Sequence, residues 1–425
     1  MSSLILLFII GGAIVLAIKW PEAVIALYIM GWPIFDYYFA AFMGSETPHF
    51  RYFFVFAIIS CLVYIIRRSF RSLPRIINLY LLLIALLNAS LYLFSLIGQG
   101  DSIYGLYHFQ SMFWRGTFPL ALILLMMTEA GQLKRFFAAA ALIGGLTGLI
   151  ALQTFRSIIV EDQFRSVLLF NFSPVALART CALCALCALA LFWKSKKISS
   201  ALWFGTFVLA TAGTVLVQEK QAILALVIAS MVFLITGPRN RNKTLLFLGI
   251  MAGMTIIILF IFPELTWRIT YFFANLASPS SSLRLQLYAE ALKRFVENPL
   301  LGTGVGSGVQ IMGEGLYPHN LFLEIASEMG LCGLLLLGLL LMLVIKALKT
   351  GYRTSAGNDE FRSWFACLSA IFAFNLVVAM ISGNVGQDPN LWVFAGMLWV
   401  FRPNKRILSP RLHKFSQFKA HETRG

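Results

Sequence analysis

Charge is scarce in this sequence. Only 12% of its 425 residues are charged, whereas 59% are hydrophobic. A soluble chain carries about 25% charged residues, so this composition excludes a disordered chain and a series of ordinary soluble domains. We therefore expect most of the chain to be surrounded by lipid.

Low-complexity tracts, hinge-like linkers and clear internal repeats are also absent, which predicts a single polytopic membrane domain over residues 1–425. Apolar stretches that approach the ~20 residues needed to cross a bilayer predict an all-α integral membrane protein with twelve or thirteen spans. The candidate spans are 4–18, 23–42, 52–66, 77–97, 116–127, 136–153, 175–193, 200–217, 222–235, 245–262, 320–345, 364–381 and 391–401. The first has no small-residue cleavage site, so we expect an uncleaved span. Whether the N-terminus lies on the cytoplasmic or the outer side of the membrane depends on whether the chain has twelve or thirteen spans.

The net charge of +16, from 34 basic and 18 acidic residues, at first suggests a nucleic-acid partner. Most of the basic residues, however, lie in alternate connections between the spans, for example at 67–75, 194–197 and 239–243. Because cytoplasmic loops carry the excess of Lys and Arg, the charge indicates membrane topology and no nucleic-acid partner. It also predicts that segment 402–425 is a cytoplasmic tail that contacts lipid headgroups.

Metal-binding motifs are missing as well. Cys181, Cys184 and Cys187 have a spacing that resembles a cluster-binding motif, but inside an apolar span it is more typical of a small-residue face that packs against another helix. The three histidines expected on the outer side lack the close spacing of a metal site; they are His49, His108 and His319. We expect neither a metal nor another cofactor.

The loop from 263 to 319 is the longest stretch without a span, and we expect it on the outer side. A loop of this length is usually functional or disordered, and its composition is not that of disorder. Periodicity predicts an amphipathic helix over 282–297. The expected apolar stripe of this helix consists of Leu285, Tyr288, Leu292 and Phe295. The expected i,i+4 charge pairs are Glu290–Arg294 and Lys293–Glu297. Asn298-Pro299 ends the helix, and we expect the glycine-rich turn 302–308 to be flexible.

Polar residues near the ends of spans are the candidates for chemistry. His319 directly precedes a span, and a neutral imidazole can remove a proton from a sugar hydroxyl; the alternative is an interfacial histidine without a catalytic role. The cationic groups of Arg284, Lys220 and Arg179 suit the diphosphate of a membrane-anchored substrate, or alternatively reach lipid headgroups. Asp36 is a carboxylate within a span, and the sequence offers no partner for it.

The outer loop and the span after it resemble the O-antigen ligase and polymerase superfamily of membrane glycosyltransferases. The residues that carry the resemblance are Arg284 at the head of a helix, Asn298-Pro299-Leu300, Gly302, Gly304, His319-Asn320, Leu323-Glu324 and Glu328-Met329-Gly330. The stretch from Asn171 to Ala178 is similar to an element at the start of a middle span in that family.

The resemblance implies a metal-independent glycosyltransferase of the GT-C type, which takes a glycan from undecaprenyl diphosphate. The acceptor would be a glycan, lipid A-core or a protein. The family carries Ser-Arg in its short outer turn, where this sequence has Glu219-Lys220; lysine keeps the charge but loses the bidentate geometry of arginine. In this interpretation His319 is the base, Arg284, Lys220 and Arg179 bind the diphosphate, and the supporting residues are Asn320, Glu324 and Glu328.

These features predict an enzyme of the bacterial inner membrane with its active site on the periplasmic face. They leave open whether it is a ligase or a polymerase. A polysaccharide or lipid-linked-glycan transporter and a non-catalytic component of an export complex are the alternatives. Transporters usually have repeats and several polar groups at mid-membrane, and both are scarce in this sequence.

Overall fold

A computed structural model describes residues 19–31, 78–127, 130–161, 174–195, 197–217, 219–237, 249, 253, 279–308, 317–355, 358–386 and 388–401. Within these residues the chain forms helices and turns, and no strand. The helices are α2 (Pro21–Met30), α5 (Leu79–Ser95), α6 (Ser102–Met112), η2 (Phe113–Thr117), α7 (Phe118–Met126), α8 (Ala130–Glu161), α9 (Pro174–Lys194), α10 (Lys197–Leu216), α11 (Lys220–Thr236), α14 (Pro279–Glu297), α16 (Leu321–Thr354), α17 (Asp359–Ile381) and α18 (Pro389–Val400).

Five of these helices, α8, α9, α10, α16 and α17, contain stretches long and apolar enough to cross a membrane, and α2, α5, α11 and α18 are shorter apolar helices. The prediction of an all-α integral membrane protein is therefore confirmed. The predicted spans 4–18 and 52–66, all of span 245–262 except residues 249 and 253, Asp36 and the tail 402–425 lie outside the described residues. The total of twelve or thirteen spans accordingly stays a prediction.

Helix α9 forms the centre of one half of the bundle, packed against α8, α10, α11 and α17. Its three cysteines are fully buried, and a Cβ added at Gly144 of α8 would overlap the side chain of Cys184. Small residues thus allow α8 and α9 to approach closely, as the sequence predicted. Among the described residues no group of three or more potential ligand side chains could hold a metal ion.

The sequence analysis predicted a span that begins at residue 116, whereas the chain is already helical from Ser102. The side chain of Asp101 caps α6 by accepting hydrogen bonds from the Ile103 and Tyr104 N–H groups at 2.9 and 3.0 Å. The helix then widens into the π-turn η2 directly before Pro119 of α7. A proline inside a helix lacks an N–H donor and its ring clashes with the carbonyl four residues earlier, and a wider turn relieves that clash.

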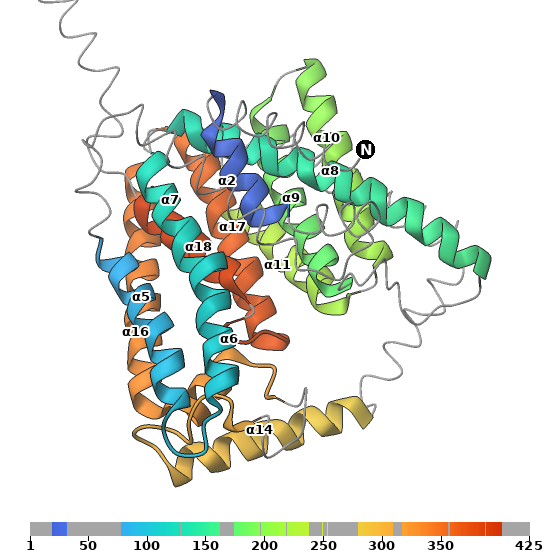
Figure 1. Cartoon of the computed structure of the whole chain (residues 1–425). Coiled ribbons are helices and arrows are strands. Elements are labelled where there is room, and N and C mark those ends of the chain that lie inside the picture. Colours follow the sequence, from blue (N-terminus) through green and yellow to red (C-terminus); the bar gives the residue numbers. More distant parts are fainter. Residues whose placement is uncertain are drawn as a thin grey trace, which may run out of the picture.

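Helix α14 lies across the end of the bundle, roughly perpendicular to α5 and α16 (Figure 1). Both predicted charge pairs are present, at 3.1 Å for Arg294 Nε and Glu290 Oε1 and at 3.9 Å for Lys293 Nζ and Glu297 Oε1. The predicted apolar stripe is not the side of α14 that is buried, since Leu285 and Leu292 are 67% and 50% exposed. The buried line is Leu287, Ala291 and Arg294, because the apolar face of α14 is wider than its contact with α16.

Helix α16 is broken at Gly330, which has φ +60°. A break leaves the next N–H groups without their helical acceptors. The turn after α14 supplies replacements, because the Leu331 N–H donates to the Pro299 carbonyl at 2.8 Å and the Cys332 N–H to that of Leu300 at 3.3 Å. The broken helix and the outer loop therefore depend on each other.

Substitution of Gly330 tests this dependence. A Cβ at Gly330 would lie 2.6 Å from the Leu300 carbonyl, and its backbone conformation, with φ +60° and ψ −152°, costs an ordinary residue about 1–3 kcal/mol. We expect Gly330→Ala to lower the thermal unfolding temperature in detergent clearly. Gly338→Ala is the matched control on the same helix, because a Cβ there meets no atom within 4 Å. Equal unfolding temperatures for the two variants would contradict the account.

Candidate active site

His319 lies at the end of the bundle where α16 begins. The next residue, Asn320, caps α16 by accepting hydrogen bonds from the Phe322 and Leu323 N–H groups at 3.0 and 3.2 Å. Its Nδ2 donates to the Met380 carbonyl of α17 at 3.0 Å. His319 itself has φ +52°, the one such non-glycine residue in the described chain. This backbone region is disfavoured for a non-glycine residue, so the surrounding contacts hold the histidine in place.

The ring of His319 packs against that of Tyr317 at a tilt of 42°, with ring centroids 3.9 Å apart. Its Nδ1 atom is buried and has no hydrogen-bond partner within the described part of the chain. Partial burial and the nearby charge of Arg284 lower the pKa of His319, while a hydrogen bond with the backbone of Ser382 opposes them. The imidazole is therefore neutral at neutral pH, the form that accepts a proton.

Arg284 of α14 and Arg179 of α9 approach the same place from different helices. Both arginines oppose the rise in the pKa of Tyr317 to about 12, which burial, Glu324 and Asp388 produce. Since such effects fade over short distances, Tyr317 lies near all four charged groups. Arg284 shares a helix side with Leu287 and Ala291 yet is exposed. The sequence analysis missed Tyr317, whose only signal was its place two residues before His319.

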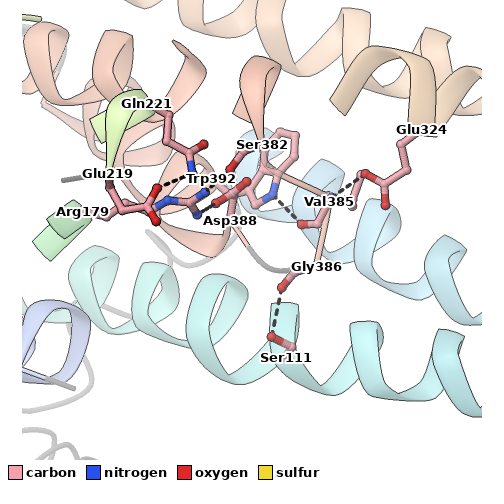
Figure 2. Close-up of polar contacts among 10 residues, drawn as sticks. All are labelled: Ser111, Arg179, Glu219, Gln221, Glu324, Ser382, Val385, Gly386, Asp388 and Trp392. Carbon is pink, nitrogen blue, oxygen red and sulfur yellow. Dashed lines mark hydrogen bonds and ion pairs between the residues drawn. The ribbon is translucent and has the colours of Figure 1, made fainter. Parts of the chain in front are cut away.

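Arg179 forms a largely buried ion pair (Figure 2). Its Nη1 lies 2.5 Å from Oδ1 of Asp388, the residue before α18, and its Nη2 donates to Ser382 Oγ at 3.0 Å. Burial raises the pKa of Asp388, and the charges of Arg179 and of Arg115 in η2 oppose that rise. The sequence did not reveal this arrangement, because Asp388 lies in a short connection distant from Arg179 along the chain.

Two glutamates one turn apart on α16 attach two loops to it. Glu328 Oε1 accepts from the Gly306 N–H, and Glu324 Oε2 accepts from the Val385 N–H, both at 3.1 Å. Backbone bonds from Thr303 to the Ser327 carbonyl and from Gly304 to the Glu328 carbonyl complete the attachment. The glycine-rich turn 302–308 is thus a fixed, hydrogen-bonded turn in its described residues, and the expectation of flexibility is wrong.

The loop before α18 is held from its other side as well (Figure 2). Ser111 Oγ of α6 donates to the Gly386 carbonyl at 2.9 Å, and Trp392 Nε1 donates to the Val385 carbonyl at 3.3 Å. Backbone groups of Val385 and Gly386 therefore have partners on α6, α16 and α18.

Lys220 is exposed at the first residue of α11, a helix that packs against α9 and α17. Its neighbours Glu219 and Gln221 share a side-chain hydrogen bond of 3.1 Å. His108 is buried in α6 and its ring packs against that of Tyr104 at a tilt of 52°, with centroids 4.1 Å apart, while His49 lies outside the described residues. Tyr317 thus contacts His319 and is acted on by the charges of Arg284 and Arg179, and the role of Lys220 stays a prediction.

The model of the O-antigen ligase family matches residues 205–338. Residues 205–338 are therefore similar to the O-antigen ligase family. This region includes Lys220, Arg284, His319 and both glutamates of α16, whereas Arg179 and Asp388 lie outside it.

Part of the chain is also similar to curated proteins from Rickettsia species, and the names of two of them begin with "Putative polysaccharide ligase". The protein from Rickettsia bellii (strain RML369-C) is 34% identical over 148 residues, and that from Rickettsia conorii (strain ATCC VR-613 / Malish 7) is 31% identical over 147 residues. In both cases the alignment covers 31% of this chain and 33% of the relative. The chain therefore matches about a third of the length of these proteins. No solved structure matches the chain.

The Arg179–Asp388 pair can be tested by a double-mutant cycle. Asp388→Leu leaves the guanidinium, whose side chain is 18% exposed, without its carboxylate, and breaking such a buried pair typically costs about 3–5 kcal/mol. We expect this single variant to unfold at a much lower temperature, and Arg179→Met to restore stability in the double variant. If the double variant is no more stable than Asp388→Leu alone, the two side chains do not act as a pair.

Proposed function

We propose that this protein is a membrane glycosyltransferase of the O-antigen ligase type. It transfers a glycan from an undecaprenyl-diphosphate carrier to an acceptor hydroxyl on the outer face of the bacterial inner membrane. The acceptor oxygen forms the new bond to the anomeric carbon, and the bond from that carbon to the diphosphate breaks. The diphosphate leaves with the electron pair, so the reaction needs no nucleotide.

The observation that carries this proposal is that Arg284 lies close enough to His319 for its charge to act on the imidazole. They come from α14 and from the link before α16, and the charge of Arg284 acts on the pKa of His319. A guanidinium suits a leaving diphosphate, and a neutral imidazole beside it suits an attacking hydroxyl. In this proposal Arg284 assists the leaving group and His319 assists the attacking hydroxyl.

The proposed roles follow from these positions. His319 takes the proton of the acceptor hydroxyl, Arg284 neutralises charge on the diphosphate, and Lys220 adds a second cation. Arg179 would join them when the diphosphate competes with Asp388 for its guanidinium. These cations supply the charge stabilisation that a metal ion provides in other transferases, so we propose a metal-independent reaction. Asn320, Glu324 and Glu328 hold the backbone around the site.

The proposed topology follows from the distribution of basic residues. Residues 1–425 form one membrane domain, the outer loop 263–319 faces the periplasm, and the tail 402–425 lies in the cytoplasm. The donor is presented on the periplasmic face. Whether the acceptor is a second lipid-linked glycan, lipid A-core or a protein separates a polymerase from a ligase.

Glycan analysis of a strain that lacks the protein tests the proposal. We expect shortened or unattached glycan, with the lipid-linked donor accumulating on the outer face. Donor trapped on the cytoplasmic face would instead establish a transporter. Loss of export without a change in the bond to the acceptor would indicate a non-catalytic export component.

The pH dependence of transfer tests the pairing of Arg284 with His319. Loss of a general base typically costs about 10²–10⁴-fold, so His319→Ala should lose most turnover. Because the positive charge of Arg284 lowers the pKa of His319, Arg284→Gln should raise that pKa. Since the base acts when deprotonated, the acidic limb of kcat/KM should then move to higher pH.

Two control variants accompany this measurement. Arg284→Lys keeps the charge and should leave the acidic limb near its wild-type position. Lys293→Gln removes an exposed charge from the same helix and should not move it. An acidic limb that is identical in Arg284→Gln and wild type would show that Arg284 does not act on the base.

A further inference from the structure

The exposed side of α14 carries an apolar stripe that the packing of the bundle does not use. Its members are Leu285, Leu292 and Val296, exposed by 67%, 50% and 74%. Their spacing of seven and four residues places them on one side of the helix. Leu300, 66% exposed, follows in the turn after α14. We call these four residues the outer stripe.

The outer stripe continues into the exposed face of α16. The backbone bonds from Leu331 to Pro299 and from Cys332 to Leu300 place the end of the stripe beside this part of α16. Leu331 is 42% exposed, and it is the first of a line of exposed apolar residues along the candidate span. The line continues with Leu335, Leu339, Met342 and Ile345. A line of this kind on a spanning helix faces lipid.

The length of α16 fixes the depth of the outer stripe. Lys346 is the first basic residue after the apolar line and marks one boundary of the hydrocarbon. About 20 helical residues cross the hydrocarbon core, so the other boundary lies near residue 326. Leu331 and Cys332, and therefore the turn bonded to them, fall inside that thickness. Because α14 lies across the bundle end (Figure 1), it runs along the membrane plane at this boundary.

We propose that α14 is an interfacial helix whose outer stripe contacts the lipids of the leaflet at which α16 begins. The occupant is lipid because the stripe is apolar, continuous with a lipid-facing line and placed at hydrocarbon depth. The neighbouring side of α14, with Gln286 and Glu297, faces water. Resting on the proposed function, one consequence is that this contact holds Arg284 at the depth of the donor diphosphate.

Spin-label accessibility in lipid nanodiscs tests the lipid contact without any substrate. Adjacent positions give matched pairs, Leu285→Cys with Gln286→Cys and Val296→Cys with Glu297→Cys, in a background in which Cys61 and Cys332 are replaced by alanine. A labelling blank of that background shows whether the remaining thiols react. Each label is then exposed to oxygen, which concentrates in the bilayer, and to a nickel chelate, which stays in water.

We expect labels at 285 and 296 to collide several-fold more with oxygen than with the chelate, relative to their partners at 286 and 297. Equal chelate accessibility within each pair would overturn the proposal, because the stripe would then face water. Protection of 285 and 296 from both reagents would also overturn it, because another protein segment would then cover the stripe. Lipid contact together with an inactive enzyme would count against the proposed function alone.

Discussion

Backbone groups in a membrane must find hydrogen-bond partners within the protein, since lipid offers none. The break of α16 at Gly330 leaves backbone N–H groups without acceptors in their own helix, so other parts of the chain must supply them. Without the carbonyls of Pro299 and Leu300, the N–H groups of Leu331 and Cys332 would lack acceptors, and an unsatisfied buried donor costs about 1–3 kcal/mol. The outer loop therefore completes a spanning helix, and the helix in turn fixes the loop.

The same stretch of α16 organises the rest of the candidate site. Its Ser327 and Glu328 carbonyls bind the glycine-rich turn, and its Glu324 carboxylate binds the loop before Asp388. Asn320 starts the helix and ties it to α17. His319, with its disfavoured backbone conformation, stands directly before this framework. A catalytic side chain is positioned well when rigid neighbours determine its conformation.

The sequence predicted those features that lipid imposes locally. Span 77–97 corresponds to α5 at Leu79–Ser95 and span 175–193 to α9 at Pro174–Lys194, because uninterrupted apolar stretches have few other solutions. Helix α6 escaped prediction since Tyr104, His108 and Gln110 interrupt its apolar pattern. The pairing of Arg179 with Asp388 also escaped, because it joins residues 209 positions apart and only the folded bundle brings them together. The exposure of part of the apolar face of α14 could not be predicted either. Periodicity shows which residues form that face, but it does not show how much of the face packs against the bundle.

Transfer in a purified system tests the central claim most directly. The protein is reconstituted in liposomes with an undecaprenyl-diphosphate-linked glycan and an acceptor, without nucleotide and with a metal chelator. The account predicts that the glycan moves to the acceptor and that undecaprenyl diphosphate is released, and that His319→Ala binds the donor but does not transfer the glycan. An intact donor with the wild-type protein, or transfer by His319→Ala at the wild-type rate, would contradict it.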